Sequence, residues 1–337
     1  MPGFWDTVFL VYEILAIYLV VRFLAALIFS LVATIYIHWL YKKLFQPVNL
    51  TSRYGKWAVV TGCTDGIGKN YAKELAARKL NLVLISRNAE KLGALAKEIE
   101  SEFGVAIVKI VADFTGGQDI YKKIEDDIKD LDIGVLVNNV GITNPKPIYL
   151  EEMSAREMWD LVLVNVGAST AMTHLVLPGM KRRRRGIIVN ISAFLERGPI
   201  PYFSLYAATK AYMKSFSDAL RFECQGTGVE VQTLSPSFVN TQQSAAWGVT
   251  SDQEGLFVPS PSIFAKHAVA TLGIAQNTSG YWPHELQYEF FKLGNDWVWM
   301  SGATKRFPTP SRVTITEVPA DEPEKTEEQS EEKSHNE

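Results

Sequence analysis

The chain has 337 residues, of which 47% are apolar and 21% are charged, so it can bury a sizeable core and is neither a disordered nor a collagen-like polymer. The net charge of −3 is uneven, because residues 317–337 carry nine acidic side chains against two lysines and leave the remainder at +4. The two cysteines, Cys63 and Cys224, exclude a disulfide framework and favour a reducing compartment.

The N-terminal 46 residues are expected to form a membrane anchor. Residues 23–41 contain no formal charge and reach about 28 Å as a helix, which is close to the thickness of a bilayer's hydrocarbon core. We predict one membrane span there. A second apolar segment at 14–21 leaves a short hairpin of two segments as the alternative. Arg22 lies between them and belongs near an interface, because an arginine at mid-membrane costs about 2.5–3.5 kcal/mol.

The charges around this stretch predict its orientation. The acidic residues Asp6 and Glu13 precede it. The residues that follow it are basic: Lys42, Lys43, Arg53 and Lys56. The positive-inside rule then places the large domain in the cytosol. A cleavable secretory signal is a poorer reading, because no basic segment precedes the apolar stretch and no small-residue cleavage site follows it. This orientation leaves the glycosylation sequons at Asn49 and Asn277 unused.

Residues 56–240 alternate short β-branched runs with longer amphipathic stretches. The runs lie at 57–60, 82–86, 105–111, 133–138, 186–192 and 229–235. The amphipathic stretches lie near 68–79, 88–103, 118–130, 154–180 and 205–224. Six runs joined by crossovers of this length predict an α/β fold, a doubly wound parallel sheet of Rossmann type with helices on both faces. The dinucleotide-binding domain is expected to occupy residues 47–280.

The regular pattern fades toward the C-terminus. Residues 260–276 predict one more helix. Within residues 281–315, the segment 281–300 contains three tryptophans and only scattered charge. It could cap a substrate cleft, lie on a membrane interface or form a packed C-terminal subdomain. Residues 316–337 are highly charged and poor in aromatic residues, which predicts a disordered acidic tail.

A glycine-rich loop follows the first predicted strand and precedes a helical pattern. Residues 61–68 read TGCTDGIG. Glycines allow the backbone to approach a pyrophosphate closely, and the N-terminus of the following helix meets its negative charge. The candidate cofactor residues in this loop are Gly62, Thr64, Asp65, Gly66, Ile67 and Gly68. Cys63 is read as a small packing residue.

The ends of the next three strands carry further candidate cofactor contacts, since ligands bind at the carboxyl ends of such strands. Arg87 stands where an acidic residue would bind a ribose 2′-hydroxyl, so it favours the 2′-phosphate of NADP(H) over NAD(H). An ordinary solvated arginine is the alternative. Asp113 is placed to meet the adenine. Asn139 and Gly141 are expected under the ribose and the nicotinamide.

Tyr206 and Lys210 are the candidate proton-transfer pair. Their separation of four residues puts both side chains on one face of a helix. A free phenol titrates near 10 and is a reluctant acid at neutral pH. We expect the nearby ammonium to lower the pKa of Tyr206 and let the phenol exchange a proton with a substrate oxygen.

These motifs together resemble the short-chain dehydrogenase/reductase superfamily. They are TGCTDGIG at 61–68, NNVG at 138–141, Asn165 and YAATK at 206–210. The resemblance covers about residues 55–240. It implies that Tyr206 is the acid/base, that Lys210 binds the nicotinamide ribose and tunes the tyrosine, and that Asn165 holds a water in a proton relay. By analogy alone, it also implies a homodimer through the helices near 154–180 and 205–224.

A narrower resemblance concerns membrane-bound enzymes of lipid metabolism. The segments DGIGKNYAKELA, LVLPGM and SPSFVNT are similar to the very-long-chain 3-oxoacyl-CoA reductases, also called 17-beta-hydroxysteroid dehydrogenase type 12, and to the hydroxysteroid dehydrogenase-like branch. This resemblance implies fatty acid elongation or steroid metabolism at the endoplasmic reticulum membrane, with a mitochondrial membrane as the alternative. Pro236 and Val239 in the last segment are further candidate cofactor contacts.

The chain departs from the family at one catalytic position. The family serine lies three residues after Asn190 and thirteen before Tyr206, where this chain has Ala193. That serine donates a hydrogen bond to the substrate oxygen, and losing such a donor costs about 10²–10³ in rate. Ser192 is the candidate substitute. Because neighbours on a strand face opposite sides, it could act only if the strand ends early and the loop turns it inward.

The sequence therefore predicts a membrane-anchored NADP(H)-dependent ketoreductase of a lipophilic carbonyl, such as a 3-oxoacyl-CoA or a ketosteroid, with Tyr206 as proton donor. The alternative is a pseudoenzyme that keeps the fold and acts as a binding or scaffold protein.

The basic run 181–185 is interpreted as a solvated helix end. Binding of lipid headgroups or of a coenzyme A phosphate is the alternative. The run lacks interleaved aromatic residues, so no nucleic acid partner is expected. The histidines have no ligand-like spacing, so no metal is expected.

Overall fold

A computed structural model describes residues 3–44, 48–245, 247–291 and 300. Within these residues, seven parallel strands form one sheet in the order β3-β2-β1-β4-β5-β6-β7. The strands are β1 (Trp57–Thr61), β2 (Asn81–Ser86), β3 (Ile107–Val111), β4 (Ile133–Asn138), β5 (Gly186–Ile191), β6 (Val229–Leu234) and β7 (Asn277–Thr278). The strand order reverses between β1 and β4, which is where doubly wound sheets bind ligands.

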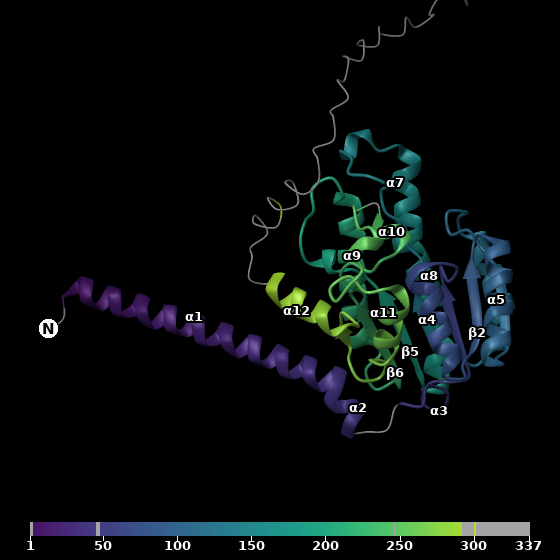
Figure 1. The fold of residues 1–337 in the computed structure, drawn as a ribbon, viewed down its shortest axis with the longest axis horizontal. Coiled ribbons are helices and arrows are strands. Elements are labelled where there is room, and N and C mark those ends of the chain that lie inside the picture. Colours follow the sequence, from purple (N-terminus) through teal and green to yellow (C-terminus); the bar gives the residue numbers. More distant parts are fainter. Residues whose placement is uncertain (1–2, 45–47, 246, 292–299, 301–337) are drawn as a thin grey trace, which may run out of the picture.

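Helices cover both faces of the sheet (Figure 1). One face is covered by α4 (Gly66–Ala77), α5 (Ala89–Phe103) and α11 (Pro261–Val269). The other is covered by α6 (Asp119–Ile128), α8 (Ala168–Arg183) and α9 (Ser204–Glu223). The remaining longer helices of the domain are α7 (Ala155–Val162) and α12 (Trp282–Phe291), with the short α10 (Gln242–Ala245) between β6 and α11. The prediction of a doubly wound Rossmann-type sheet is confirmed.

Three details differ from the prediction. The expected helix at 154–180 is divided into α7 and α8 by a π-helical turn at Leu163–Gly167. The helix expected over 260–276 ends at Val269, and Gly273 shortly after adopts a left-handed φ of +75°. The sequence did not predict β7, because a two-residue strand is too short to show an alternating pattern.

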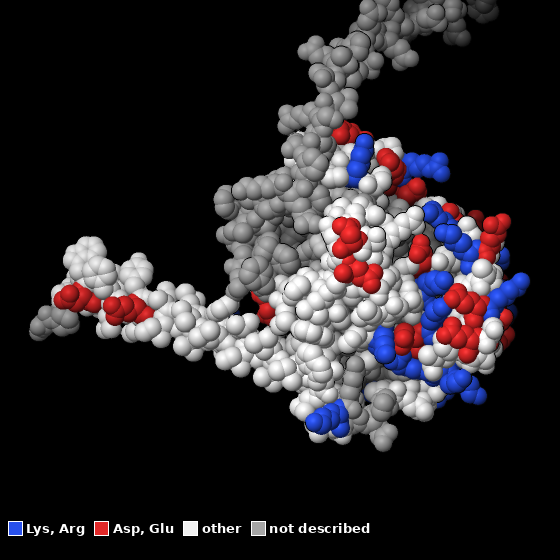
Figure 2. All heavy atoms as spheres, in the orientation of Figure 1, with Lys and Arg blue, Asp and Glu red and all other residues white. Residues whose placement is uncertain are grey.

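The N-terminal segment is one continuous helix and not a hairpin. Helix α1 (Phe4–Ile35) passes through a π-helical turn at Tyr36–Leu40 into α2 (Tyr41–Leu44), without a break between 14–21 and 23–41. The two-segment alternative is therefore wrong. Figure 2 shows α1 as mainly uncharged, whereas charged side chains gather over α4 and α5. Of the described helices, two are long and apolar enough to cross a membrane: this one, whose side chains are exposed, and the partly buried core stretch 155–183.

The π-helical turn that follows α1 packs against the domain that holds the sheet. The rings of Trp39 and Trp282 lie 5.2 Å apart, and those of His38 and His267 lie 6.4 Å apart. Farther along the chain, α3 (Leu50–Arg53) is tied to β6, because Arg53 forms an ion pair with Glu230 at 2.6 Å. The helix is thus fixed to the domain through α11 and α12, and the segment that follows it through β6.

Two other predicted segments are partly placed by the structure. Tyr281, the residue before α12, is buried in the core beneath α4, α5 and α11, and Trp282 at the start of α12 packs against that core. Residues 292–299 and 301–315 lie outside the described residues, so the assignment of 281–315 stays a prediction. The acidic tail, 316–337, lies outside the described residues. In the basic run, Arg183 and Arg185 each pair with Asp132 at 2.9 Å, at the end of the sheet opposite the carboxyl ends of the strands. These contacts favour the reading of a helix end.

Candidate active site

A cavity of about 1070 Å³ opens at the carboxyl ends of the strands. Its volume lies at the upper end of the range of about 300–1,000 Å³ that is usual for small-molecule sites. Every candidate cofactor residue named from the sequence lines it, and so do Ser192 and Ala193. The cavity therefore brings the glycine loop, the ends of the strands and the tyrosine–lysine pair into one site.

The glycine loop is held tightly against the end of β4. Gly62 has a left-handed φ of +63°, and a side chain on Gly68 would collide with the Asn139 amide and the Gly62 carbonyl. Asn139 Nδ2 donates hydrogen bonds to the carbonyls of Thr61 at 2.9 Å and Gly62 at 3.0 Å. The amide of Asn139 therefore shapes the loop, a role that the sequence did not reveal. The Asp65 carboxylate caps α4 by accepting from the Gly66 N–H at 2.7 Å.

Two basic side chains line the end of the cavity beside β2. Arg87 is exposed on its wall, and Lys91 from the first turn of α5 lines it too. Lys91 was not among the residues predicted from the sequence. Asn88 marks the start of α5 and places Lys91 at the third helical position, where the Asn88 side chain accepts a hydrogen bond from the Lys91 N–H. Two cations beside a glycine-rich cradle fit a dinucleotide that carries an extra phosphate.

Asp113 lines the same end of the cavity, but its carboxylate serves the local turn. Oδ1 of Asp113 accepts from the N–H of Thr115 at 3.0 Å and from its hydroxyl at 2.9 Å. Across the wall, the hydroxyls of Thr64 and Ser86 lie 2.9 Å apart and join the glycine loop to β2. The shape of this end is therefore set before any ligand arrives.

Tyr206 and Lys210 are both buried in the first two turns of α9. The Lys210 ammonium lies 5.6 Å from the centre of the Tyr206 ring and donates to the carbonyl of Ile191 at 3.3 Å. Burial raises the pKa of Tyr206 above its ordinary value. Burial also lowers the pKa of Lys210 to about 8, and the Glu196 carboxylate partly offsets that shift. The expectation of a lowered tyrosine pKa is thus wrong for the described chain, because desolvation raises the pKa of this buried phenol.

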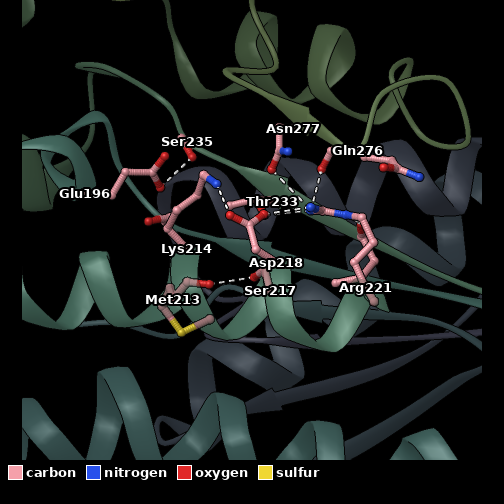
Figure 3. Close-up of polar contacts among 12 residues, drawn as sticks. Glu196, Met213, Lys214, Ser217, Asp218, Arg221, Thr233, Ser235, Gln276 and Asn277 are labelled. Atoms are coloured by element: carbon pink, nitrogen blue, oxygen red, sulfur yellow. Dashed lines mark hydrogen bonds and ion pairs between the residues drawn. The ribbon is translucent and has the colours of Figure 1, made fainter. Parts of the chain in front are cut away.

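Polar contacts behind the site fix α9 against the sheet (Figure 3). Arg221 donates to the hydroxyl of Thr233 and to the carbonyl of Gln276, each at 3.2 Å, and so ties α9 to β6 and to the residue before β7. Ser235 donates to Glu196 at 2.8 Å and holds the loop after β5. The position of Tyr206 therefore depends on the contacts of Arg221, about four helical turns along α9, and on the loop that Ser235 and Glu196 hold.

Asn165 lies in the π-helical turn and not in the cavity wall. Its Oδ1 accepts from the Ile142 N–H at 2.8 Å, while its Nδ2 donates to the Ile142 carbonyl at 2.9 Å and to Thr209 Oγ1 at 3.1 Å. The side chain thus joins the loop after β4 to α9. The water-relay role that the resemblance implies stays a prediction, although π-helical turns often mark functional sites.

No hydroxyl occupies the family serine position. Ala193 packs against the apolar cluster around Tyr206. The hydroxyl of Ser192 is buried and donates to the carbonyl of Lys210 at 3.0 Å. The Ser192 hydroxyl therefore donates to the backbone of α9, although the residue lines the cavity, and its role as a substitute for the missing serine stays a prediction.

An aromatic wall stands beside Tyr206. The rings of Trp247 and Phe203 are stacked with their centres 3.8 Å apart, and the Trp247 ring lies 5.7 Å from that of Tyr206. Phe194 and Phe238 extend this wall into the cavity. The sequence pattern could not place Trp247, because it lies in an irregular segment after α10. A wall of this kind binds apolar molecules.

The sequence of the whole domain agrees with this geometry. The family model for short chain dehydrogenases matches residues 56–251. The chain belongs to the short-chain dehydrogenase family. Its fold, glycine loop and buried tyrosine–lysine pair are those of an oxidoreductase family that uses nicotinamide dinucleotides.

Three similar proteins place the chain within the family. It is 46% identical to inactive hydroxysteroid dehydrogenase-like protein 1 of Homo sapiens over 261 residues. The aligned region covers 77% of this chain and 79% of that protein. It is 42% identical over 241 residues to the very-long-chain 3-oxoacyl-CoA reductase of Anas platyrhynchos, with coverages of 71% and 76%. A short-chain dehydrogenase from Sphingobium yanoikuyae, solved in complex with NADPH, has a TM-score of 0.63 and 26% identity, with coverages of 77% and 98%.

The first prediction tests the close approach in the glycine loop. Gly68→Ala should weaken the binding of NADPH and NADH by more than tenfold, because the added methyl group must push the loop away from Asn139. Equilibrium titration of nucleotide fluorescence measures the loss. Gly93→Ala in α5 is the matched control, since its methyl group would meet no atom within 4 Å. Equal affinities for the two variants would contradict this account of the loop.

The second prediction concerns the cost of the buried lysine. The unfolded chain binds a proton at Lys210 up to pH 10.5, whereas the folded chain loses it near pH 8. Stability should therefore rise with pH between these values, and the buried ammonium should cost about 3 kcal/mol at pH 7. Lys210→Met should raise the free energy of unfolding at pH 7 by about 2 kcal/mol, after the loss of the hydrogen bond to Ile191 is allowed for.

Unfolding of the detergent-solubilised chain as a function of pH measures this effect. Lys214→Met on the same helix is the control. Lys214 is partly exposed and pairs with Asp218, so its loss should change stability by less than about 1 kcal/mol and should not stabilise. A Lys210→Met variant that is no more stable than the parent at pH 7 would refute the assigned cost.

Proposed function

We propose that the protein is a membrane-anchored, NADP(H)-dependent ketoreductase of a lipophilic carbonyl compound. One observation carries the proposal: Tyr206 and Lys210 are buried together in a cavity that also contains a phosphate cradle and an aromatic wall. A phenol in that position can reach a substrate oxygen, and the aromatic wall selects an apolar substrate.

The side chains divide the work of such a reduction. A bound nicotinamide dinucleotide supplies the hydride for the carbonyl carbon. The loop at 61–68 and the N-terminus of α4 would hold its pyrophosphate, and Arg87 with Lys91 would hold a 2′-phosphate. Tyr206 donates its phenolic proton to the substrate oxygen. Below about pH 8 Lys210 is an ammonium, and its charge offsets that of the phenolate which remains.

The substrate class rests on two features. The exposed apolar helix α1 supports a membrane location, which we assign to the endoplasmic reticulum with the domain in the cytosol. The aromatic wall around Trp247 supports a substrate that partitions into lipid. A relative is named a very-long-chain 3-oxoacyl-CoA reductase. A 3-oxoacyl-CoA or a ketosteroid is therefore the proposed substrate.

A second candidate function is that of a pseudoenzyme that binds its ligands without turnover. Ala193 supplies no hydrogen bond to a substrate oxygen, and the Ser192 hydroxyl is bound to the backbone of Lys210. The relative from Homo sapiens is named inactive. The buried Tyr206 and Lys210 favour catalysis over this reading.

The third prediction tests catalysis directly. Tyr206→Phe in the full chain, purified in detergent, should lower NADPH-dependent reduction of a 3-oxoacyl-CoA or a ketosteroid by about 10²-fold or more, because the proton donor is removed. NADPH affinity should change little. Turnover is followed by the loss of NADPH absorbance. Equal rates for the parent and the variant would remove Tyr206 from the mechanism.

The fourth prediction distinguishes an impaired enzyme from a pseudoenzyme. Ala193→Ser should raise kcat by about 10²–10³, because it restores a donor to the substrate oxygen. Ala245→Ser, also on the cavity wall, is the matched control and should leave kcat unchanged. Tight NADPH binding without turnover in both Ala193→Ser and the parent would establish the pseudoenzyme.

A further inference from the structure

His284 on α12 is buried, with 1% of its surface exposed, and lies outside the cavity wall. We propose that His284 is a positioning residue that joins the loop after β6 to the segment before α11 and so fixes the substrate side of the cavity. This inference rests on the proposed function for its kinetic consequence, but its structural consequence can be measured in a protein without turnover.

The two ring nitrogens of His284 contact two different loops. Nδ1 accepts a hydrogen bond from the N–H of Ser237 at 3.3 Å, and Nε2 lies 3.3 Å from the carbonyl oxygen of Phe257. A backbone N–H can only donate and a backbone carbonyl can only accept. The two partners therefore fix one form of the ring, a neutral imidazole with its proton on Nε2.

The two loops that His284 joins border the site from different sides. Ser237 and its neighbour Phe238 line the main cavity, and Phe238 belongs to the aromatic wall. Phe257 lies between Ser251 and Pro261, which line an adjoining cavity of about 470 Å³. The adjoining cavity shares part of its wall with the main one, including Thr241. The imidazole thus holds the inner wall and the outer loop at a fixed separation.

The surroundings keep the ring neutral. The ring of Tyr281, the residue before α12, lies 5.1 Å from the centre of the His284 ring, and that of Phe264 in α11 lies 6.0 Å away. His267 of α11 packs on the far side of Tyr281 at 5.2 Å, and the Glu285 carboxylate of α12 is engaged by Thr278 and Ser279. Burial lowers the pKa of His284 to about 4, and backbone contacts with Phe257 and Phe238 partly offset that shift. The ring is therefore neutral at physiological pH.

Helix α12 is itself held on its other side. Trp282, two residues before His284, packs on Trp39 in the π-helical turn that follows α1. The helix that carries the imidazole is thus placed between the N-terminal helix and the loops of the site (Figure 1). His284 does not line the cavity, but from this position it can fix the loop that carries Ser237 and Phe238.

The fifth prediction separates the two hydrogen bonds of His284. In the full chain in detergent, His284→Asn can keep an acceptor for Ser237, His284→Gln can keep a donor to Phe257, and His284→Leu keeps neither. Each should raise KM for the lipophilic ketone, by about tenfold for His284→Leu, because a buried backbone group loses its partner. The value of kcat should change less. His174→Gln, at an exposed histidine of α8, should behave as the parent.

One binding measurement and one proteolysis measurement accompany the kinetics. Adenosine 2′,5′-bisphosphate should bind all variants equally, because its site is the distant end near Arg87. A glutamate-specific protease should cut after the exposed Glu254 several-fold faster in His284→Leu than in the parent, because the segment before α11 is released. The cleavage test needs no turnover, so it decides the inference even if the proposed reductase activity fails.

Two results would overturn the inference. Parental cleavage rates and parental KM values in His284→Leu would show that the loops stand without the imidazole. Loss of adenosine 2′,5′-bisphosphate binding in the same variant would show that His284 supports the whole fold and not one wall. Faster cleavage with unchanged nucleotide binding, in a chain that turns over no ketone, would keep the positioning role and refute only the reductase.

Discussion

The burial of a phenol and an amine in the wall of one cavity is the constraint on which the rest of the structure depends. Burial disfavours the charged form of each group, as the opposite shifts in the pKa of Tyr206 and Lys210 show, although Lys210 stays an ammonium below about pH 8. The fold must therefore hold them by contacts made elsewhere. Arg221 joins α9 to the sheet edge, and Asn165 joins α9 to the loop after β4. These contacts fix α9 and so hold Tyr206 and Lys210 in place against the cost of burying them.

The repeating parts of the fold could be predicted from the sequence. The apolar runs placed six strands within two residues of their observed bounds, and the glycine loop and the YAATK motif placed the cavity. Contacts between distant irregular segments could not be predicted. Trp247 lies in an irregular segment and His284 bonds to two loops, and no spacing rule connects such residues with the site. Desolvation escaped prediction for a similar reason, because the pKa of Tyr206 reflects the packing around it.

The position of Ala193 separates two requirements that the family usually combines. A hydroxyl at this point contributes to the rate, whereas the tyrosine and lysine supply the proton and its electrostatic support. This chain keeps the second set and lacks the first. Ser192 beside it has become part of the framework, since its hydrogen bond to the Lys210 carbonyl joins the end of β5 to α9. The tyrosine and lysine are thus held in place in a site that lacks the hydroxyl of the family serine.

The length of α1 has a consequence for how the domain would stand on a bilayer. The helical stretch from Phe4 to Leu40 has 37 residues, or about 55 Å, against a hydrocarbon thickness of about 30 Å. Tilt alone would have to reach roughly 57° to absorb this mismatch, well beyond the usual range of about 0–40°. Part of the helix must therefore stay outside the lipid core. Its last turns pack on α12. In the membrane-anchored protein that we propose, this contact would set the height of the cavity above the membrane.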